Sequence, residues 1–289
     1  MEPLFRSIDL QEGLDQDGVV TVPLLNADEL QAVRDFYYTV NPDGVVPQLR
    51  EGIHMTIWCS DPDYKAHIRE ELQRLLQPAM QRLFHDCRLV TPVFIVKVPG
   101  QQTTFPIHQD WSVVDETRHT ALNVWVPLHD VDERNGGLWA VPGSHRLGNH
   151  IRGPGHLFPN LRSIESAVRP RMRAAGGQAG TATVFYHRVI HGSPPNLSEA
   201  PRVALACSIL PRDVPLHIYF QRDAESPLRV YHPPDDFIYG FENVRDQTAL
   251  RPPEGEPVAS LPPYVPRPIV AADVDLCIGN DLRPVATNG

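Results

Sequence analysis

The chain has 289 residues, which is enough for one large domain with a substantial core. Hydrophobic residues make up 42% and charged residues 21%, as in ordinary globular proteins, and no apolar run reaches the roughly 20 residues that span a bilayer. The net charge of -9 disfavours a nucleic-acid partner, because phosphates attract a basic surface. The composition therefore predicts a soluble protein that acts on a small molecule.

The first residues contain neither a basic cluster nor an apolar run, so no secretory signal is expected and the predicted location is the cytoplasm. The 4 cysteines form no CxxC pair, which argues against a structural zinc site or a disulfide framework. Among the 26 basic residues only Lys65 and Lys97 are lysines, a bias typical of GC-rich coding that favours a bacterial source.

The first part of the chain is expected to be mainly helical. After a short opening helix, a β-branched run predicts a strand. Asn26 followed by Glu29 has the pattern of a capping box, and apolar residues recur at helical spacing after it. In a later helix, Pro78 is expected to kink or divide the element. The expected elements are a strand over 19–23 and helices over 28–38 and 64–84.

From about residue 88 short β-rich runs replace the helical pattern. Turns containing Gly, Pro, Asn and Asp separate these runs, which is typical of a sandwich or a closed β architecture. The expected strands cover 90–98, 121–128, 138–141, 182–189, 203–210 and 216–220. We therefore expect a single mainly β domain over 1–289, with a core over about 88–221, flanking N-terminal helices and a proline-rich C-terminal arm over about 251–289.

One long connection, residues 147–177, shows little regular apolar pattern and carries more basic than acidic side chains. Its arginines are Arg152, Arg162, Arg169, Arg171 and Arg173. A connection of this length within a compact domain is usually functional or disordered. We expect a lid that closes over substrate, with its arginines either binding an anionic substrate or forming a solvated basic surface.

Two histidines and an aspartate are spaced so that they can bind one metal ion. His108 and Asp110 are two residues apart on an extended segment, so their side chains point to the same side. His191, after a later strand, can supply a third ligand. Two imidazoles and one carboxylate form the facial triad of non-haem Fe(II), which leaves positions for a bidentate 2-oxo acid and for oxygen. The HxD pair alone is a weak motif in a chain with 13 histidines.

Arg202 supports the same chemistry. It lies eleven residues after His191 and begins an apolar strand, where an unpaired guanidinium would be costly to bury. The distal carboxylate of 2-oxoglutarate would provide a bidentate partner, and the hydroxyl of Ser193 can donate to the same region. The alternative is a surface arginine at the start of a strand.

Several motifs, taken in their order and spacing, resemble those of the phytanoyl-CoA dioxygenase family. The similarity begins at the Asp17-Gly18 turn and extends to about Leu210, about two thirds of the chain. The matching segments are His108-Gln109-Asp110, Asn135-Gly136-Gly137-Leu138, Val141-Pro142-Gly143-Ser144-His145 and His191-Gly192-Ser193, followed by Asn196 and Arg202. The joint pattern is specific, although each piece alone is not.

The resemblance implies a double-stranded β-helix, which is a jelly roll of the cupin-like kind. It also implies iron bound by His108, Asp110 and His191, and 2-oxoglutarate bound by Arg202. The expected enzyme is an Fe(II)- and 2-oxoglutarate-dependent oxygenase that consumes O2 and releases succinate and CO2. Because halogenating relatives lack the carboxylate, Asp110 favours hydroxylation of an unactivated C–H bond, although desaturation, ring formation and epimerisation share its first step.

Four further residues are candidates for the same site. Trp125 resembles a tryptophan that the family places beside the co-substrate, with core packing as the alternative. Asn123 shares a strand face with Trp125 and can line the same cavity. Family members often carry a lysine at the position of Lys97, which interrupts an apolar strand and either faces the site or lies at a solvated edge. His187 contacts substrate or is an ordinary core residue.

The expected substrate is a small molecule, and a natural-product intermediate of bacterial metabolism fits best. Two alternatives remain open from the sequence. A cupin-type metalloenzyme that does not use 2-oxoglutarate is disfavoured by Arg202 and Ser193. A catalytically silent β-sandwich binding protein is disfavoured by the complete metal triad.

Overall fold

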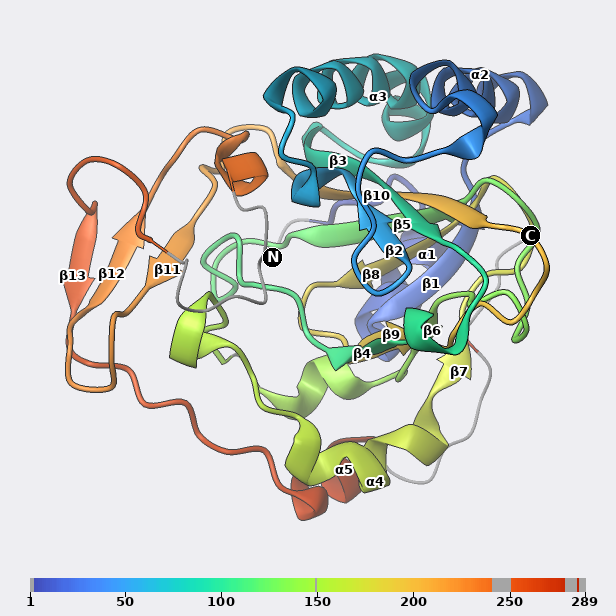
Figure 1. Ribbon diagram of the computed structural model, residues 1–289. Coiled ribbons are helices and arrows are strands. Elements are labelled where there is room, and N and C mark those ends of the chain that lie inside the picture. Colours follow the sequence, from blue (N-terminus) through green and yellow to red (C-terminus); the bar gives the residue numbers. More distant parts are fainter. Residues whose placement is uncertain (1–2, 149, 241–250, 279–284, 286–289) are drawn as a thin grey trace.

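Figure 1 shows the computed structural model, which describes residues 3–148, 150–240, 251–278 and 285. Its largest sheet has six strands, and every pairing within it is antiparallel. In spatial order these strands are β1 (Val19–Pro23), β8 (Thr181–Tyr186), β5 (Leu122–Pro127), β10 (Arg202–Pro211), β3 (Cys87–Lys97) and β2 (Ile53–Met55). The predicted mainly β architecture is confirmed.

A smaller antiparallel sheet faces the larger one across a cavity that residues of both sheets line. In spatial order its strands are β4 (Phe105–His108), β9 (His191–Ser193), β6 (Trp139–Ala140) and β7 (Arg173–Ala174). Two facing antiparallel sheets are the layout predicted for a double-stranded β-helix, although the strands described in the structure do not close into one barrel.

Three helices pack against the large sheet, and Figure 1 shows α2 and α3 together along one side of it. They are α1 (Ile8–Asp17), α2 (Ala27–Val40) and α3 (Pro62–Leu83). The capping box at the start of α2 is confirmed, since Asn26 and Glu29 exchange side-chain to backbone hydrogen bonds of 2.9 and 3.0 Å. Tyr37 of α2 packs edge-on against Phe94 of β3, with ring centroids 5.1 Å apart.

Pro78 was expected to kink or divide the second long helix. The helix is not divided there, because α3 continues from Pro62 to Leu83. Leu72, Leu76 and Met80 are buried in the core on both sides of the proline. Packing of this continuous apolar stripe holds the helix together despite the missing backbone donor at Pro78.

The six predicted strands are present with shifted ends, as β3, β5, β6, β8, β10 and β11. A third sheet was not foreseen. It comprises β11 (Ile218–Phe220), β12 (Leu228–Tyr231) and β13 (Ala259–Leu261). Through β13 the predicted C-terminal arm forms part of this sheet, and its residues 279–284 and 286–289 lie outside the described residues.

Single turns of 3₁₀ helix connect the larger elements. They are η1 (Pro42–Gly44), η2 (Thr56–Trp58), η3 (Gln101–Thr103), η4 (Ser144–Leu147), η5 (Gly155–Leu157), η6 (Arg162–Ile164), η7 (Arg169–Arg171) and η8 (Phe237–Gly240). All 4 cysteines are free. No helix among the described residues is long and apolar enough to cross a membrane.

Residues 147–177 are more regular than predicted. They contain α4 (Glu165–Val168), three of the 3₁₀ turns and β7. Their buried side chains pack with Val274 and Ile278 of the C-terminal helix α5 (Ala271–Ile278), which lies beside α4 in Figure 1. The side chains that the connection contributes to this cluster are Leu147, Leu161, Ile164, Val168 and Met172. The expectation of little apolar pattern was therefore wrong, because residues 161, 164 and 168 recur at helical spacing. Closure of the connection as a lid stays a prediction.

We predict that α5 holds this connection in place. Val274 is 0% exposed in the shared apolar cluster, so Val274→Ala should lower the free energy of unfolding by about 2 kcal/mol through two lost methyl groups and a cavity. Hydrogen exchange across residues 160–172 should become faster. Leu276→Ala is the matched control on the same helix, because Leu276 is 85% exposed and its loss should change stability by less than about 0.5 kcal/mol. Equal effects of the two variants would contradict this role of α5.

Candidate metal centre and its cavity

The two facing sheets enclose a cavity of about 530 Å³, within the usual size range of small-molecule sites. The structure brings every site residue named from the sequence to this cavity. The residues are His108, Asp110, His191, Arg202, Ser193, Trp125, Lys97 and Asn123. They come from β3, β4, β5, β9 and β10 and from the turn after β4, so strands far apart in the sequence form the cavity wall.

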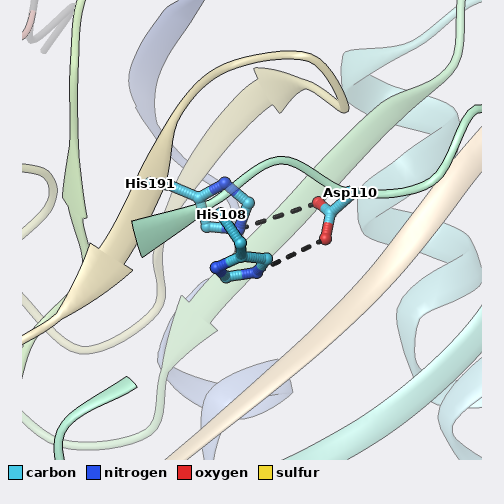
Figure 2. Close-up of side chains that lie close together, drawn as sticks. All are labelled: His108, Asp110 and His191. Atoms are coloured by element: carbon cyan, nitrogen blue, oxygen red, sulfur yellow. Dashed lines mark ion pairs between the residues drawn. The ribbon is translucent and has the colours of Figure 1, made fainter. Parts of the chain in front are cut away.

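Figure 2 shows His108, Asp110 and His191 pointing toward one another. His108 ends β4 and is the register partner of His191, which begins β9, and their ring centroids are 4.1 Å apart. Each Nε2 atom lies 3.7 Å from an oxygen of the Asp110 carboxylate. One ligand atom from each residue lies within 4.8 Å of the other two, so the three side chains could hold one metal ion.

Backbone carbonyls orient both imidazole rings. Nδ1 of His108 lies 3.0 Å from the carbonyl oxygen of Pro106, and Nδ1 of His191 lies 3.0 Å from that of Val189. Because a carbonyl can only accept, each Nδ1 carries a proton, so the neutral form of each ring has its lone pair on Nε2. This tautomer suits a neutral imidazole that ligates a metal through Nε2, and the carbonyl is the usual outer partner of such a ligand.

Asn123 has a role that the sequence did not reveal. Its side-chain amide donates a 2.9 Å hydrogen bond to Oδ2 of Asp110, so it fixes the carboxylate. Burial by itself raises the pKa of Asp110, but the neighbouring His191 and His108 and the Asn123 hydrogen bond bring this pKa below its ordinary value. Asp110 is therefore ionised at neutral pH, as metal binding requires. A contact between Asn123 and the co-substrate stays a prediction.

Gly192 allows β4 and β9 to approach each other beside the ligands. A Cβ atom at this position would lie 2.9 Å from the carbonyl oxygen of Phe105 and 3.2 Å from that of Pro106. Both are backbone atoms of β4 and cannot move without displacing His108. A side chain at position 192 would therefore separate the two histidine ligands.

Arg202 is a buried cation in the cavity wall. Its side chain lies over the ring of Trp125 at 5.6 Å from the centroid, and one Nη atom donates to the carbonyl of Ile95 at 3.3 Å. Nε has no hydrogen-bond partner, and no carboxylate among the described residues pairs with the guanidinium. Burial lowers the pKa of Arg202 to about 10. This arrangement fits an anionic ligand, because the buried guanidinium otherwise lacks compensation.

Lys97 is the register partner of Arg202 on the neighbouring strand β3. It is 0% exposed and lines the cavity, so the alternative of a solvated edge position was wrong. Its Nζ atom donates to Oγ of Ser193 at 2.5 Å and to the carbonyl of Pro194 at 2.7 Å. Burial and the adjacent charge of Arg202 lower the pKa of Lys97 to about 6. Lys97, Arg202 and Ser193 thus gather donors where a carboxylate can bind.

Arg152 was interpreted from the sequence as a contact for substrate or as solvated surface, and both interpretations were wrong. Its side chain is 0% exposed and pairs with Glu116 at 2.5 Å. Nε donates to the backbone carbonyl of Asp110 at 2.7 Å, and Nη1 donates to that of His150 at 2.6 Å. Arg152 therefore connects the turn that carries the metal-binding carboxylate to the long connection after η4. No local pattern pairs it with Glu116, which lies 36 residues away.

His187 also lines the cavity. Its Nδ1 atom lies 3.0 Å from the carbonyl of Trp111, whereas Nε2 is buried without a hydrogen-bond partner among the described residues. The backbone carbonyl of His187 accepts from the N–H of Asp110 at 2.9 Å. A contact between its side chain and substrate stays a prediction.

Residues 14–204 match the family model described as phytanoyl-CoA dioxygenase. The chain belongs to the phytanoyl-CoA dioxygenase family. The zebrafish (Danio rerio) phytanoyl-CoA dioxygenase domain-containing protein 1 is 31% identical over 137 residues, which cover 43% of this chain and 47% of that protein. The phytanoyl-CoA dioxygenase of Arabidopsis thaliana is 31% identical over 124 residues, covering 42% and 44%. The chain thus spans about half the length of the curated relatives it matches.

Solved structures share the fold of this family member. The α-ketoglutarate-dependent carbocyclase SnoK from nogalamycin biosynthesis superposes with a TM-score of 0.53 at 18% identity, over 75% of this chain and 90% of SnoK. The epimerase SnoN from the same biosynthesis gives 0.51 at 18% identity, over 89% and 95%. These enzymes depend on 2-oxoglutarate, the other name of α-ketoglutarate, and the shared fold confirms the predicted double-stranded β-helix.

We predict that the Arg152 and Glu116 pair stabilises both the fold and the turn at Asp110. Arg152→Ala should lower the free energy of unfolding by about 3–5 kcal/mol, because it leaves the Glu116 carboxylate, which is only 11% exposed, without its partner, and it should weaken Co(II) binding at the triad. Chemical denaturation and absorbance titration with Co(II) measure the two effects. Arg169→Ala is the control, because its exposed pair with Glu165 should contribute less than about 1 kcal/mol. A variant at Arg152 as stable as the control would reject the role of the pair.

Proposed function

We propose that this protein is an Fe(II)- and 2-oxoglutarate-dependent dioxygenase in which His108, Asp110 and His191 bind the iron. The observation that carries this proposal is the convergence of two imidazoles and one carboxylate within 4.8 Å, in a cavity that also contains an unpaired buried guanidinium. This donor set suits non-haem Fe(II) and leaves coordination positions open. The family and the fold support the same enzyme class.

We propose that Arg202, Lys97 and Ser193 bind the distal carboxylate of 2-oxoglutarate. The carboxylate would give Arg202 its missing partner and would favour the charged form of Lys97. Trp125 packs beneath the guanidinium and fixes its plane. Asn123 acts on the metal site through Asp110, because its amide holds the Asp110 carboxylate toward the two imidazoles.

When bound, iron and 2-oxoglutarate supply the oxidising chemistry with O2, and succinate and CO2 are released. The residues of this chain contribute placement and a suitable environment. Carbonyl partners hold the two imidazoles so that a neutral ring presents the lone pair of Nε2 to the metal, and the lowered pKa of Asp110 keeps its carboxylate ionised. The apolar wall of the cavity excludes water and orients one C–H bond of the substrate toward the iron.

The proposed reaction is hydroxylation of an unactivated C–H bond in a small natural-product intermediate, in the cytoplasm of a bacterium. SnoK and SnoN, which share this fold, belong to a natural-product biosynthesis. A metalloenzyme that does not use 2-oxoglutarate would leave Arg202 without a ligand partner. Neither alternative would release succinate, so an assay with iron, ascorbate and 2-oxoglutarate distinguishes the proposed enzyme from both.

We predict that His108→Ala, Asp110→Ala and His191→Ala each abolish release of succinate and CO2 and weaken Fe(II) binding, because each removes one of three ligands. The fold should persist, since these residues lie at the ends of short strands or just beyond them. Succinate is measured by mass spectrometry, and Fe(II) affinity is measured under anaerobic conditions. Full activity in any metal-defined variant would remove that residue from the proposed triad.

We predict that Arg202→Ala raises the Kd for 2-oxoglutarate far more than the Kd for iron. Loss of one member of a buried charge pair costs about 2–5 kcal/mol, which corresponds to roughly 30-fold to several-thousand-fold in affinity. Isothermal titration with 2-oxoglutarate and with Fe(II) gives both values. If the affinity for 2-oxoglutarate is unchanged, the anchor lies elsewhere and Lys97 is the next candidate.

We predict that binding of 2-oxoglutarate takes up a proton at pH 7.5. Lys97 has a pKa of about 6 in the free protein and is therefore mainly neutral at this pH, whereas an adjacent carboxylate favours its charged form. Proton uptake implies that affinity falls as the pH rises above about 6. Titrations in buffers of different ionisation enthalpy measure the uptake, and Lys97→Met should abolish it. Binding of 2-oxoglutarate without proton uptake by the unmodified protein would contradict this assignment.

A further inference from the structure

The cavity beyond the proposed co-substrate site has an apolar wall. Val93, Ile95 and Lys97 alternate along β3 and all line the cavity, so Lys97 marks the co-substrate end and the two aliphatic residues lead away from it. Other apolar wall residues come from several elements. They include Ile57, Phe105, Trp111, Val113, Leu138 and Ile238. A ligand in this region must therefore present apolar surface.

More basic side chains than carboxylates line the cavity. Asp110 is the only carboxylate among the described residues that line it, and it belongs to the proposed metal triad. The cations are Lys97, Arg202 and Arg162, of which the first two belong to the proposed co-substrate site. A cationic ligand would find no free carboxylate here, whereas an anionic ligand would find Arg162.

Arg162 differs from the other arginines of its connection. Buried Arg152 pairs with Glu116, Arg169 pairs with Glu165, and Arg171 pairs with Asp275 at 2.7 Å. The guanidinium of Arg173 donates to the carbonyls of Pro170 and Met172 at 2.9 and 2.7 Å. These partners satisfy the four side chains within the fold itself.

The side chain of Arg162 has no ion pair or hydrogen bond with any residue that the structure describes. Its hydrogen bonds come from the backbone alone, whose N–H donates to Oδ1 of Asn160 and whose carbonyl accepts from the N–H of Glu165. Arg162 is exposed and also lines the cavity, as does Phe158, which is 39% exposed. Residues that contact both solvent and the cavity mark its entrance. The entrance therefore combines one aromatic ring with one uncompensated positive charge.

We infer that the substrate of this site is a small organic acid with an apolar body, and that Arg162 binds its acid group at the entrance. This inference rests on the proposed function. The apolar body lies along the wall formed by β3 and contacts Phe158, while the guanidinium donates two hydrogen bonds to the carboxylate in a bidentate pair. This ion pair is close to solvent, so it contributes only a small part of the binding affinity. Its effect is that the site prefers an acid over a neutral or cationic analogue.

The test uses ligands that share one body and differ in charge. Decanoate, decanamide and decylammonium provide a chain, and 2-naphthoate, 2-naphthamide and 2-naphthylmethylammonium provide a ring. Each is titrated calorimetrically, without oxygen, into the full-length protein loaded with Fe(II) and saturating 2-oxoglutarate, so that the Arg202 site is filled. In at least one of the two series, the chain or the ring, the acid should bind about five- to ten-fold more tightly than the amide. In the same series the ammonium should bind more weakly than the amide.

Arg162→Gln should reduce the preference for the acid to less than about two-fold, and Arg169→Gln, the matched control on the same connection, should retain it. The preference in the unmodified protein should also decrease at 1 M salt, because exposed charges are screened. A preference that survives in Arg162→Gln, an amide that binds as well as the acid, or no binding on either body would overturn the inference.

The Kd for 2-oxoglutarate, measured in the same proteins, shows whether a negative result rejects only the substrate inference or the proposed function as well. If 2-oxoglutarate binds and is turned over to succinate but no acid is preferred, only the substrate inference is rejected. If 2-oxoglutarate does not bind at all, the proposed function itself is rejected, and the substrate inference with it.

Discussion

The register of β4 with β9 is the constraint on which the candidate metal centre depends. It places His108 opposite His191, and a shift by one residue would turn one imidazole to the other face of the sheet. Gly192 allows the close approach of the two strands. A hydrogen bond from the N–H of Asp110 to the carbonyl of His187 joins the turn after β4 to the segment before β9. The carboxylate is therefore aimed at the two imidazoles by backbone contacts as well as by Asn123.

Burial of positive charge shapes the other end of the cavity. Lys97 and Arg202 are register partners in adjacent strands whose other side chains are mainly apolar. Each raises the electrostatic cost of burying the other, which is one cause of the low pKa of Lys97. A bound carboxylate would remove this repulsion and satisfy both groups. Because burying two basic side chains next to each other is so costly, such pairs are rare in cores that serve packing alone.

The connection over residues 147–177 joins the metal centre to the C-terminal part of the chain. Arg152 attaches its beginning to the carbonyl of Asp110, and Val274 and Ile278 of α5 cover its apolar side. These contacts hold the connection at both ends, while Phe158 and Arg162 between them face the cavity. The shape of the entrance thus depends on residues that are distant in sequence from the ligands.

The sequence by itself determined the features that local geometry controls. The two-residue spacing of His108 and Asp110 brings both side chains to one site, β-branched runs form the six predicted strands, and a capping box begins α2. The unusual position of Arg202 at the start of an apolar strand also indicated an anion-binding role before its burial was known.

Only the tertiary structure decided which partners these residues meet. The bond from Asn123 to Asp110, the burial of Arg152 against Glu116 and the contact of Lys97 with Ser193 all join segments that are far apart in the chain. The same is true of the third sheet and of α5 on the long connection. Residue type and spacing report the periodicity of one element, whereas strand pairing and the burial of a charge depend on which elements pack together.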